Sequence, residues 1–194
     1  MIKVIDNCLN EEVFKDLCVI AQDVPYQFQA NTAYDNAEDA SSFNCLYTIK
    51  ELAKENGKII EEDPLGMAVS TIIKNAVLQA NMPFNGIGRI RFAILHKTNK
   101  NTNAPHIDYH LKHKVGLIYL NNSDGETVLY NEKINWENLH NPDNLMEYFK
   151  QPVTIDKKIK PKTNRMILFD GNQLHSSTNP SKSDYRMVLN FNYV

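Results

Sequence analysis

The chain has 194 residues, of which 42% are hydrophobic and 23% are charged, and its formal net charge is −2. These values sit near globular averages and predict a single domain, residues 1–194, with its own hydrophobic core. The small net charge argues against nucleic acid as a partner, and no apolar run is long enough to predict a membrane span.

The first part of the chain, residues 1–85, is predicted to be a helix-rich support. Asn10 is a good N-cap, and apolar residues recur at helical spacing over 13–21. A second start signal is Asp63 followed by proline, and one apolar stripe then extends over 65–80. We therefore expect two amphipathic helices that need a partner surface.

The chain shows no feature of a secreted protein. Residues 1–6 lack the apolar segment and cleavage site of a secretory signal, so we expect a cytoplasmic location. The cysteines are odd in number and lack C-x-x-C spacing, and we interpret them as buried small hydrophobes. They are Cys8, Cys18 and Cys45.

Two further segments are predicted to consist of loops with only short helices. Polar residues 23–44 predict a loop, with a short helix near 46–54. Residues 131–151 read as an insertion in which Asn141 begins a helix. This insertion is either a lid over a site or a surface helix anchored by Trp136.

The second part of the chain, residues 86–194, changes to the period of two that is typical of strands. Bounded runs predict strands at 89–95, 115–121, 127–131, 153–155, 166–170 and 185–193. Short strands at regular spacing indicate a sandwich or barrel.

The sequence His106-Ile107-Asp108 is the leading candidate for a functional site. Residues two apart in a strand share a face, so the imidazole and the carboxylate can meet one metal ion. A later turn at Asp170-Gly171 would return His175 to the same place. Two histidines and one carboxylate are the ligands of non-haem Fe(II) sites with open positions, although Zn(II) tolerates the same set.

Arg186 lies on the polar face of the last predicted strand, which would point into the interior beside His175. A buried guanidinium needs an anion, either a dicarboxylate ligand or one of the chain's own acids. The nearby histidines and the basic run of the chain are expected to lie outside the site. His110 and His113 are predicted to be exposed, and the basic run 157–165 is predicted to be a solvated loop.

Taken together, these elements resemble the Fe(II)/2-oxoglutarate-dependent oxygenases, and within them the prolyl-hydroxylase-like branch. The resemblance covers about 86–194. It implies a double-stranded β-helix of the jelly-roll type, an α+β and mainly β fold with supporting N-terminal helices. The elements occur in this order: His106-Ile107-Asp108, Leu117-Ile118-Tyr119-Leu120-Asn121, Gly125-Glu126-Thr127, residues 164–170, His175 and Arg186.

The resemblance also implies a ligand set. Fe(II) would be held by the two histidines and the aspartate, and 2-oxoglutarate would chelate it. Arg186 would pair with the 5-carboxylate of 2-oxoglutarate, and Tyr119 would add a hydrogen bond. His96 stands ten residues before the first metal ligand, where related enzymes often place a tyrosine, and we expect it to keep a hydrogen bond to the co-substrate.

The implied activity is hydroxylation of a C–H bond with O2, releasing succinate and CO2, with ascorbate as a candidate reductant. The primary substrate stays open between a prolyl or other peptidyl group and a small molecule. The alternative from another class is a non-catalytic β-barrel that binds a metal or a small anion.

Overall fold

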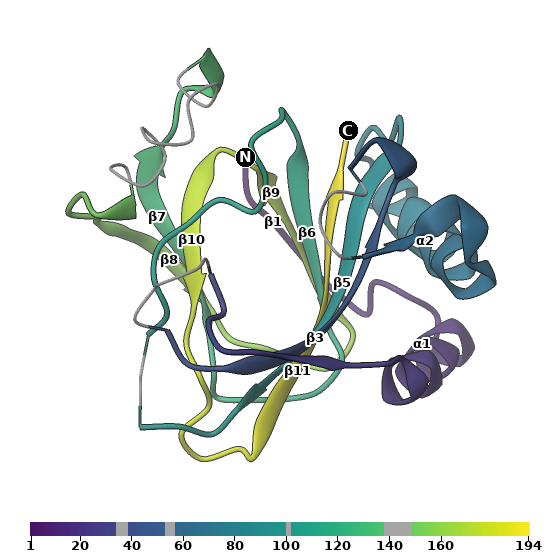
Figure 1. The fold of residues 1–194 in the computed structure, drawn as a ribbon, viewed down its shortest axis with the longest axis horizontal. Helices are drawn as coiled ribbons and strands as arrows, with labels where there is room; N and C mark the ends of the chain where they lie inside the picture. The colour runs from purple at the N-terminus through teal and green to yellow at the C-terminus, as the bar shows by residue number, and fades with distance from the viewer. Residues whose placement is uncertain (34–38, 53–56, 100–101, 138–148) are drawn as a thin grey trace.

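In the computed structural model, two antiparallel sheets face each other, and two helices cover the outer face of the larger sheet (Figure 1). The structure describes residues 1–33, 39–52, 57–99, 102–137 and 149–194. Within them, no helix is long and apolar enough to cross a membrane.

The large sheet has eight strands, seven of them in the order β1-β9-β6-β11-β5-β3-β2, and β4 pairs in parallel with β3. Its strands in chain order are β1 (Lys3–Asp6), β2 (Gln27–Gln29), β3 (Ser42–Thr48), β4 (Lys58–Ile59), β5 (Ile87–His96), β6 (Lys114–Tyr119), β9 (Arg165–Asp170) and β11 (Tyr185–Tyr193).

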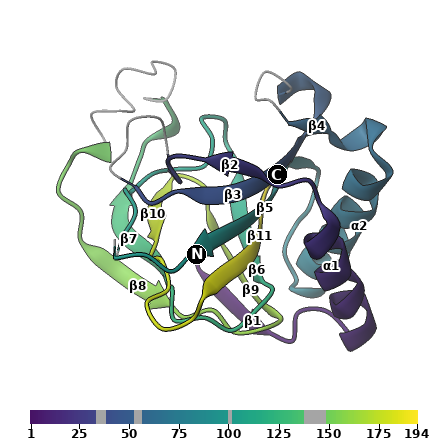
Figure 2. The same cartoon turned by 60° about the horizontal axis from the view of Figure 1, so that its bottom comes forward.

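The small sheet has the order β10-β7-β8 and lies on the side of the molecule away from the helices (Figure 2). Its strands are β7 (Thr127–Lys133), β8 (Ile155–Ile159) and β10 (Gln173–Ser177). Two antiparallel sheets with crossovers between them are the jelly-roll arrangement that was predicted.

Helix α1 (Glu11–Asp23) and helix α2 (Pro64–Gln79) begin where the sequence predicted. The Asn10 side chain accepts a hydrogen bond from Val13 N at 2.8 Å, and Asp63 accepts from the first-turn amides of α2. Two single-turn 3₁₀ helices, Lys50–Leu52 and Ile60–Glu62, flank β4. Capping of this kind stabilises a helix by about 1 kcal/mol.

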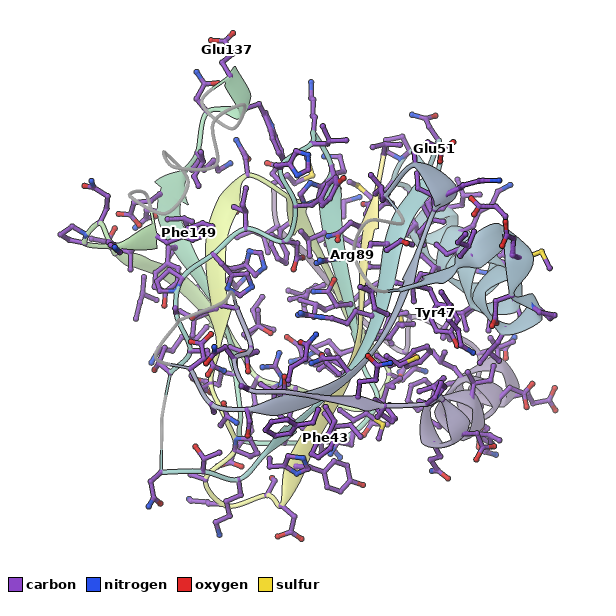
Figure 3. All side chains as sticks on the ribbon, in the orientation of Figure 1. Phe43, Tyr47, Glu51, Arg89, Glu137 and Phe149 are labelled. Carbon is purple, nitrogen blue, oxygen red and sulfur yellow. The ribbon has the colours of Figure 1, made fainter. Side chains whose placement is uncertain are left out.

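The apolar faces of α1 and α2 pack on the outer face of the large sheet. Leu17 and Ile73 are fully buried there, together with Leu189 and Phe191 of β11. Tyr47 lies between the sheet and the helices (Figure 3). Burying one such side chain contributes about 1.5–3 kcal/mol, so this layer supplies much of the stability.

Two expectations about local structure in the first part of the chain need correction. The predicted loop over 23–44 contains β2 and the start of β3, which pairs along its whole length with β5. The helix predicted near 46–54 is reduced to the single turn Lys50–Leu52, because β3 continues to Thr48. The inner face of β3 carries Ser42 and Asn44, so its sequence lacks the apolar alternation of a core strand.

The basic run also differs from the prediction. Its first part lies in β8, which begins at Ile155, and its lysines are solvent-exposed on the strand as they would be in a loop. The helix expected from Asn141 falls in residues 138–148, outside the described part of the chain.

Candidate metal centre

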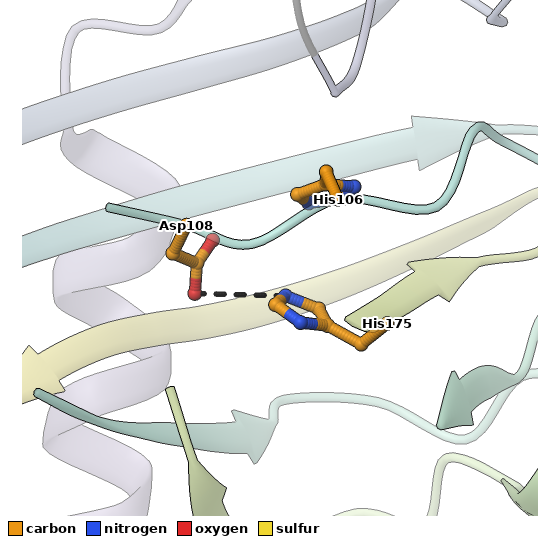
Figure 4. A group of neighbouring side chains, drawn as sticks. All are labelled: His106, Asp108 and His175. Carbon is orange, nitrogen blue, oxygen red and sulfur yellow. Dashed lines mark ion pairs between the residues drawn. The ribbon is translucent and has the colours of Figure 1, made fainter. Parts of the chain in front are cut away.

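The two histidines are brought together by a backbone bridge between the loop after β5 and strand β10. His106 N donates to His175 O at 2.9 Å, and His175 N donates to His106 O at 3.0 Å. Asp108 follows in a bend rather than in the strand that we predicted. Even so, ligand atoms of the three side chains all lie within 4.8 Å of one another (Figure 4).

Both imidazoles are oriented by backbone carbonyl groups. His106 Nδ1 lies 3.0 Å from Ala104 O, and His175 Nδ1 lies 3.1 Å from Gln173 O. With Nδ1 as the donor, the lone pair is on Nε2, and the buried His175 Nε2 has no hydrogen-bond partner in the described part of the chain. Burial, and then the neighbouring His175, lowers the pKa of His106 to about 3, so its ring is neutral and able to bind a metal ion.

Three side chains of the large sheet hold the carboxylate of Asp108. Arg89 of β5 pairs with Asp108 Oδ1 at 2.9 Å. Asn190 and Asn192 of β11 donate to Oδ2 at 3.2 and 3.0 Å, and Asn192 Oδ1 accepts from Arg89 Nε at 2.8 Å. Burial acts to raise the pKa of Asp108, but the charge of Arg89 and the other nearby groups hold it well below its usual range. We call Arg89, Asn190 and Asn192 the carboxylate clamp.

The carboxylate clamp was missed by the sequence reasoning. The alternation that placed Arg186 inward put Asn190 and Asn192 on the same face, but it gave them no role beside Asp108. Arg89 points into the space between the sheets (Figure 3). No sequence signal linked it to Asp108, because the pairing of β5 with β11 is set by the fold.

Arg186 is buried, with 2% of its surface exposed. Its Nη atoms donate to Glu126 O at 3.2 Å and to Thr127 Oγ1 at 2.7 Å, while its Nε has no hydrogen-bond partner. Among the described residues, no carboxylate forms an ion pair with it. Burial lowers the pKa of Arg186, and the neighbouring Tyr119 acts in the opposite direction.

Tyr119, to which the resemblance assigned a hydrogen bond to the co-substrate, lies beside Arg186. Its hydroxyl donates to Thr127 Oγ1 at 2.7 Å, and the Arg186 guanidinium lies 5.7 Å from its ring centre. Thr127 therefore connects the two side chains. A carboxylate that enters here would meet a guanidinium, a phenol and a threonine hydroxyl.

One cavity, the inner cavity, extends from the metal ligands to Arg186. Its volume is about 30 Å³, smaller than a five-carbon dicarboxylate, so side chains around it must shift when such a ligand binds. It is lined by Thr32, Arg91, Ala93, Leu95, His106, Leu117, Thr127, His175, Ser176, Ser177, Arg186, Val188 and Asn190.

His96 does not join this site. It is exposed at the end of β5, and its ring packs edge-on against Phe43 at 5.1 Å. Its neighbour Leu95 lines the inner cavity, and successive strand residues point to opposite faces. The expected hydrogen bond from His96 to a co-substrate is therefore contradicted by strand parity.

His113 is buried rather than exposed, whereas His110 is exposed as predicted. A Cβ at Gly171 would overlap the His113 ring, so the turn before His175 requires glycine for this close approach. Trp136 packs edge-on against the same ring at 5.5 Å. His113 thus supports the turn from outside the set of metal ligands.

No protein family model and no curated protein matches the sequence. Solved structures do match over the whole chain. An oxidoreductase of the 2OG-Fe(II) oxygenase family from Burkholderia pseudomallei has a TM-score of 0.66 at 12% identity, with 99% of this chain and 84% of that chain covered. This chain has the fold of the 2OG-Fe(II) oxygenases.

Two further matches agree on that fold. A prolyl hydroxylase from Trichoplax adhaerens, in complex with a peptide fragment of hypoxia inducible factor, has a TM-score of 0.58 at 15% identity, covering 99% of this chain and 82% of that one. The epimerase SnoN, in complex with Fe3+, alpha ketoglutarate and nogalamycin RO, has a TM-score of 0.63 at 9% identity, covering 100% and 78%. The predicted jelly-roll is confirmed.

Proposed function

We propose that this protein is an Fe(II)- and 2-oxoglutarate-dependent dioxygenase that hydroxylates a C–H bond and releases succinate and CO2. One observation carries the proposal. A buried set of two histidines and one carboxylate lies at one end of the inner cavity, and at the other lies a buried arginine that pairs with no carboxylate of the described residues. When bound, Fe(II) and 2-oxoglutarate supply the oxygen activation that hydroxylation needs.

Each residue has a role that follows from its contacts. His106 and His175 offer their Nε2 atoms to the metal ion, and Asp108 offers a carboxylate that the carboxylate clamp keeps charged and fixed. Arg186 and Tyr119 bind the 5-carboxylate of the co-substrate, since pairing removes the cost of a buried, uncompensated guanidinium. The protein thereby orients the co-substrate before oxygen arrives.

The primary substrate is a separate part of the proposal. Prolyl or other peptidyl hydroxylation is supported by the resemblance to prolyl hydroxylases, and a small-molecule substrate fits the same centre. Because one fold of this type supports many reactions, the substrate must be argued from the surroundings of the metal centre.

An anaerobic titration of Fe(II) and 2-oxoglutarate tests the proposal. Chelation of Fe(II) by a 2-oxo acid gives a visible charge-transfer band, which we expect in the wild type. His175→Ala abolishes the band, and Arg186→Ala moves it to at least about tenfold higher 2-oxoglutarate, the effect of losing a charged hydrogen bond. His96→Ala is the matched control and leaves the titration unchanged.

A second outcome would favour the alternative function. If folded, iron-loaded wild-type protein gives no band and forms no succinate with ascorbate and O2 present, it does not use 2-oxoglutarate. The chain would then be a metal- or anion-binding β-barrel, for which Zn(II) is an equally suitable ion.

A further inference from the structure

A second hollow, the outer pocket, lies next to the metal centre but outside the inner cavity. Its volume is about 290 Å³, close to the lower limit for ligand sites. Arg89 and Asn192 line the outer pocket, while Arg91 and Asn190, two residues away on the same strands, line the inner cavity. Asp108 contacts both asparagines and therefore lies between the two spaces.

Two side chains that line the outer pocket also contact Asp108. Arg89 lies 2.9 Å from Asp108 Oδ1, and Asn192 lies 3.0 Å from Oδ2. Both direct these polar groups toward the carboxylate. A ligand in the outer pocket would therefore contact Arg89 and Asn192, which in turn contact the candidate metal ligand Asp108.

The rest of the outer pocket is mainly apolar, and among the described residues part of its lining stays exposed. Leu111 and Val194 line it and are 51% and 53% exposed, whereas apolar side chains of this size are usually buried. The rim charges are of opposite sign, Glu51 and Lys112, and they give no preference for a charged ligand. The apolar lining residues are Ile49, Leu52, Ile87, Tyr109, Leu111 and Val194.

The two spaces are therefore suited to different chemistry. The inner cavity ends at the buried cation of Arg186 and suits a dicarboxylate. The outer pocket disfavours a carboxylate, since an anion would lose its hydration at the apolar wall and the charge of Lys112 on the rim is matched by that of Glu51. An uncharged group gains the free energy of covering Leu111 and Val194.

We propose that the outer pocket binds the primary substrate through a neutral apolar group the size of a branched aliphatic or aromatic side chain. This inference rests on the proposed function, because it assumes that the site beside Asp108 holds the metal ion. It assigns the substrate to an uncharged, apolar class and distinguishes it from the anionic co-substrate.

Paramagnetic relaxation of a small probe tests the location and the class together. Benzyl alcohol is titrated into protein loaded with 2-oxoglutarate and either Mn(II) or diamagnetic Zn(II), with benzylamine and benzoate as charged analogues. We expect faster relaxation of the benzyl alcohol protons with Mn(II) only, and at least about fivefold weaker binding of both charged analogues. Equal relaxation with both metals, or preferred binding of a charged analogue, would overturn the inference.

Substitutions in the outer pocket locate the probe. Leu111→Ser weakens benzyl alcohol binding about fourfold or more, the factor expected for each methylene-sized loss of apolar contact. Val19→Ser removes a similarly exposed side chain from α1, 58% exposed, and leaves binding unchanged. Gly86→Leu fills the pocket and abolishes binding, because a Cβ there meets only Val194 Cγ2 at 3.8 Å.

The failure of this inference and the failure of the proposed function can be told apart. If wild-type protein gives the Fe(II) charge-transfer band with 2-oxoglutarate but benzyl alcohol binding does not respond to Leu111→Ser or Gly86→Leu, the outer pocket is not the substrate site. If the band itself is absent, the proposed function fails first.

Discussion

The outer and inner faces of the large sheet differ in what they bury. The outer face buries apolar side chains of β5, β6, β9 and β11 under the two helices. The inner face of β5 and β11 buries Arg89, Asn190, Asn192 and Arg186 beside an apolar cluster that includes Leu95 and Val188. Burial stabilises the first set, whereas it costs free energy for the second unless each group has a partner. Both faces therefore contribute apolar packing, and the inner face adds buried polar groups that a ligand can contact.

The largest expected effect tests the inner face. Arg89→Met leaves Asp108 buried without its compensating cation, and we expect the metal-free protein to lose about 3–5 kcal/mol of unfolding free energy. Zn(II) should restore more stability to this variant than to the wild type, because the ion then compensates Asp108. Urea unfolding with and without Zn(II) measures both effects, and an unchanged metal-free midpoint would show that the pair is not stabilising.

A substitution on the outer face should affect stability alone. Ile73→Ala in α2 removes a fully buried side chain and costs about 2–5 kcal/mol. We expect the affinity for 2-oxoglutarate, measured at a temperature where the variant is folded, to stay at the wild-type value. A parallel loss of affinity would mean that the two faces are coupled.

Arg186→Met should have the reverse pattern. Loss of charged hydrogen bonds to the co-substrate lowers its affinity about 10- to 100-fold. The ligand-free protein should be as stable as the wild type or more stable, since an uncompensated buried charge is replaced by an apolar side chain. Calorimetric titration measures the affinity for the co-substrate, and urea unfolding of the same sample measures the stability. A ligand-free variant less stable than the wild type would contradict the expected stability.

The smallest effect lies at the edge of the outer layer. Asn10→Ala removes the side-chain cap of α1 and should lower stability by about 1 kcal/mol. Asn10→Asp, which keeps an oxygen acceptor, should restore most of the loss. Chemical unfolding of the two variants compares them, and equal stability would show that the cap contributes nothing measurable.

The outer face was well predicted from the sequence because apolar periodicity and capping residues report directly on it. The alternation in β11 also placed Arg186 inward, and the His-x-Asp spacing with a later histidine predicted the cluster of His106, Asp108 and His175. Each of these signals lies within one segment or depends on the type of residue alone.

The parts that were missed depend on pairing between distant segments. Strand β3 was mistaken for loop and helix because its inner residues, such as Ser42 and Asn44, are polar. His96 was placed in the site by its distance from His106 in the sequence, but a shift of one residue in a strand reverses the direction of the side chain. The partnership of Arg89 with Asp108 requires the register between β5 and β11, which no local pattern contains.

The reciprocal backbone bonds between His106 and His175 have a mechanical consequence. His175 belongs to the small sheet, while Asp108, two residues after His106, is tied to the large sheet through Arg89 and β11. A bound ion would therefore connect the two sheets. The amide hydrogens of His106 and His175 should exchange with solvent as one cooperative unit, and the ion should slow that exchange. Metal binding would then determine how firmly the small sheet is held against the large sheet at this centre.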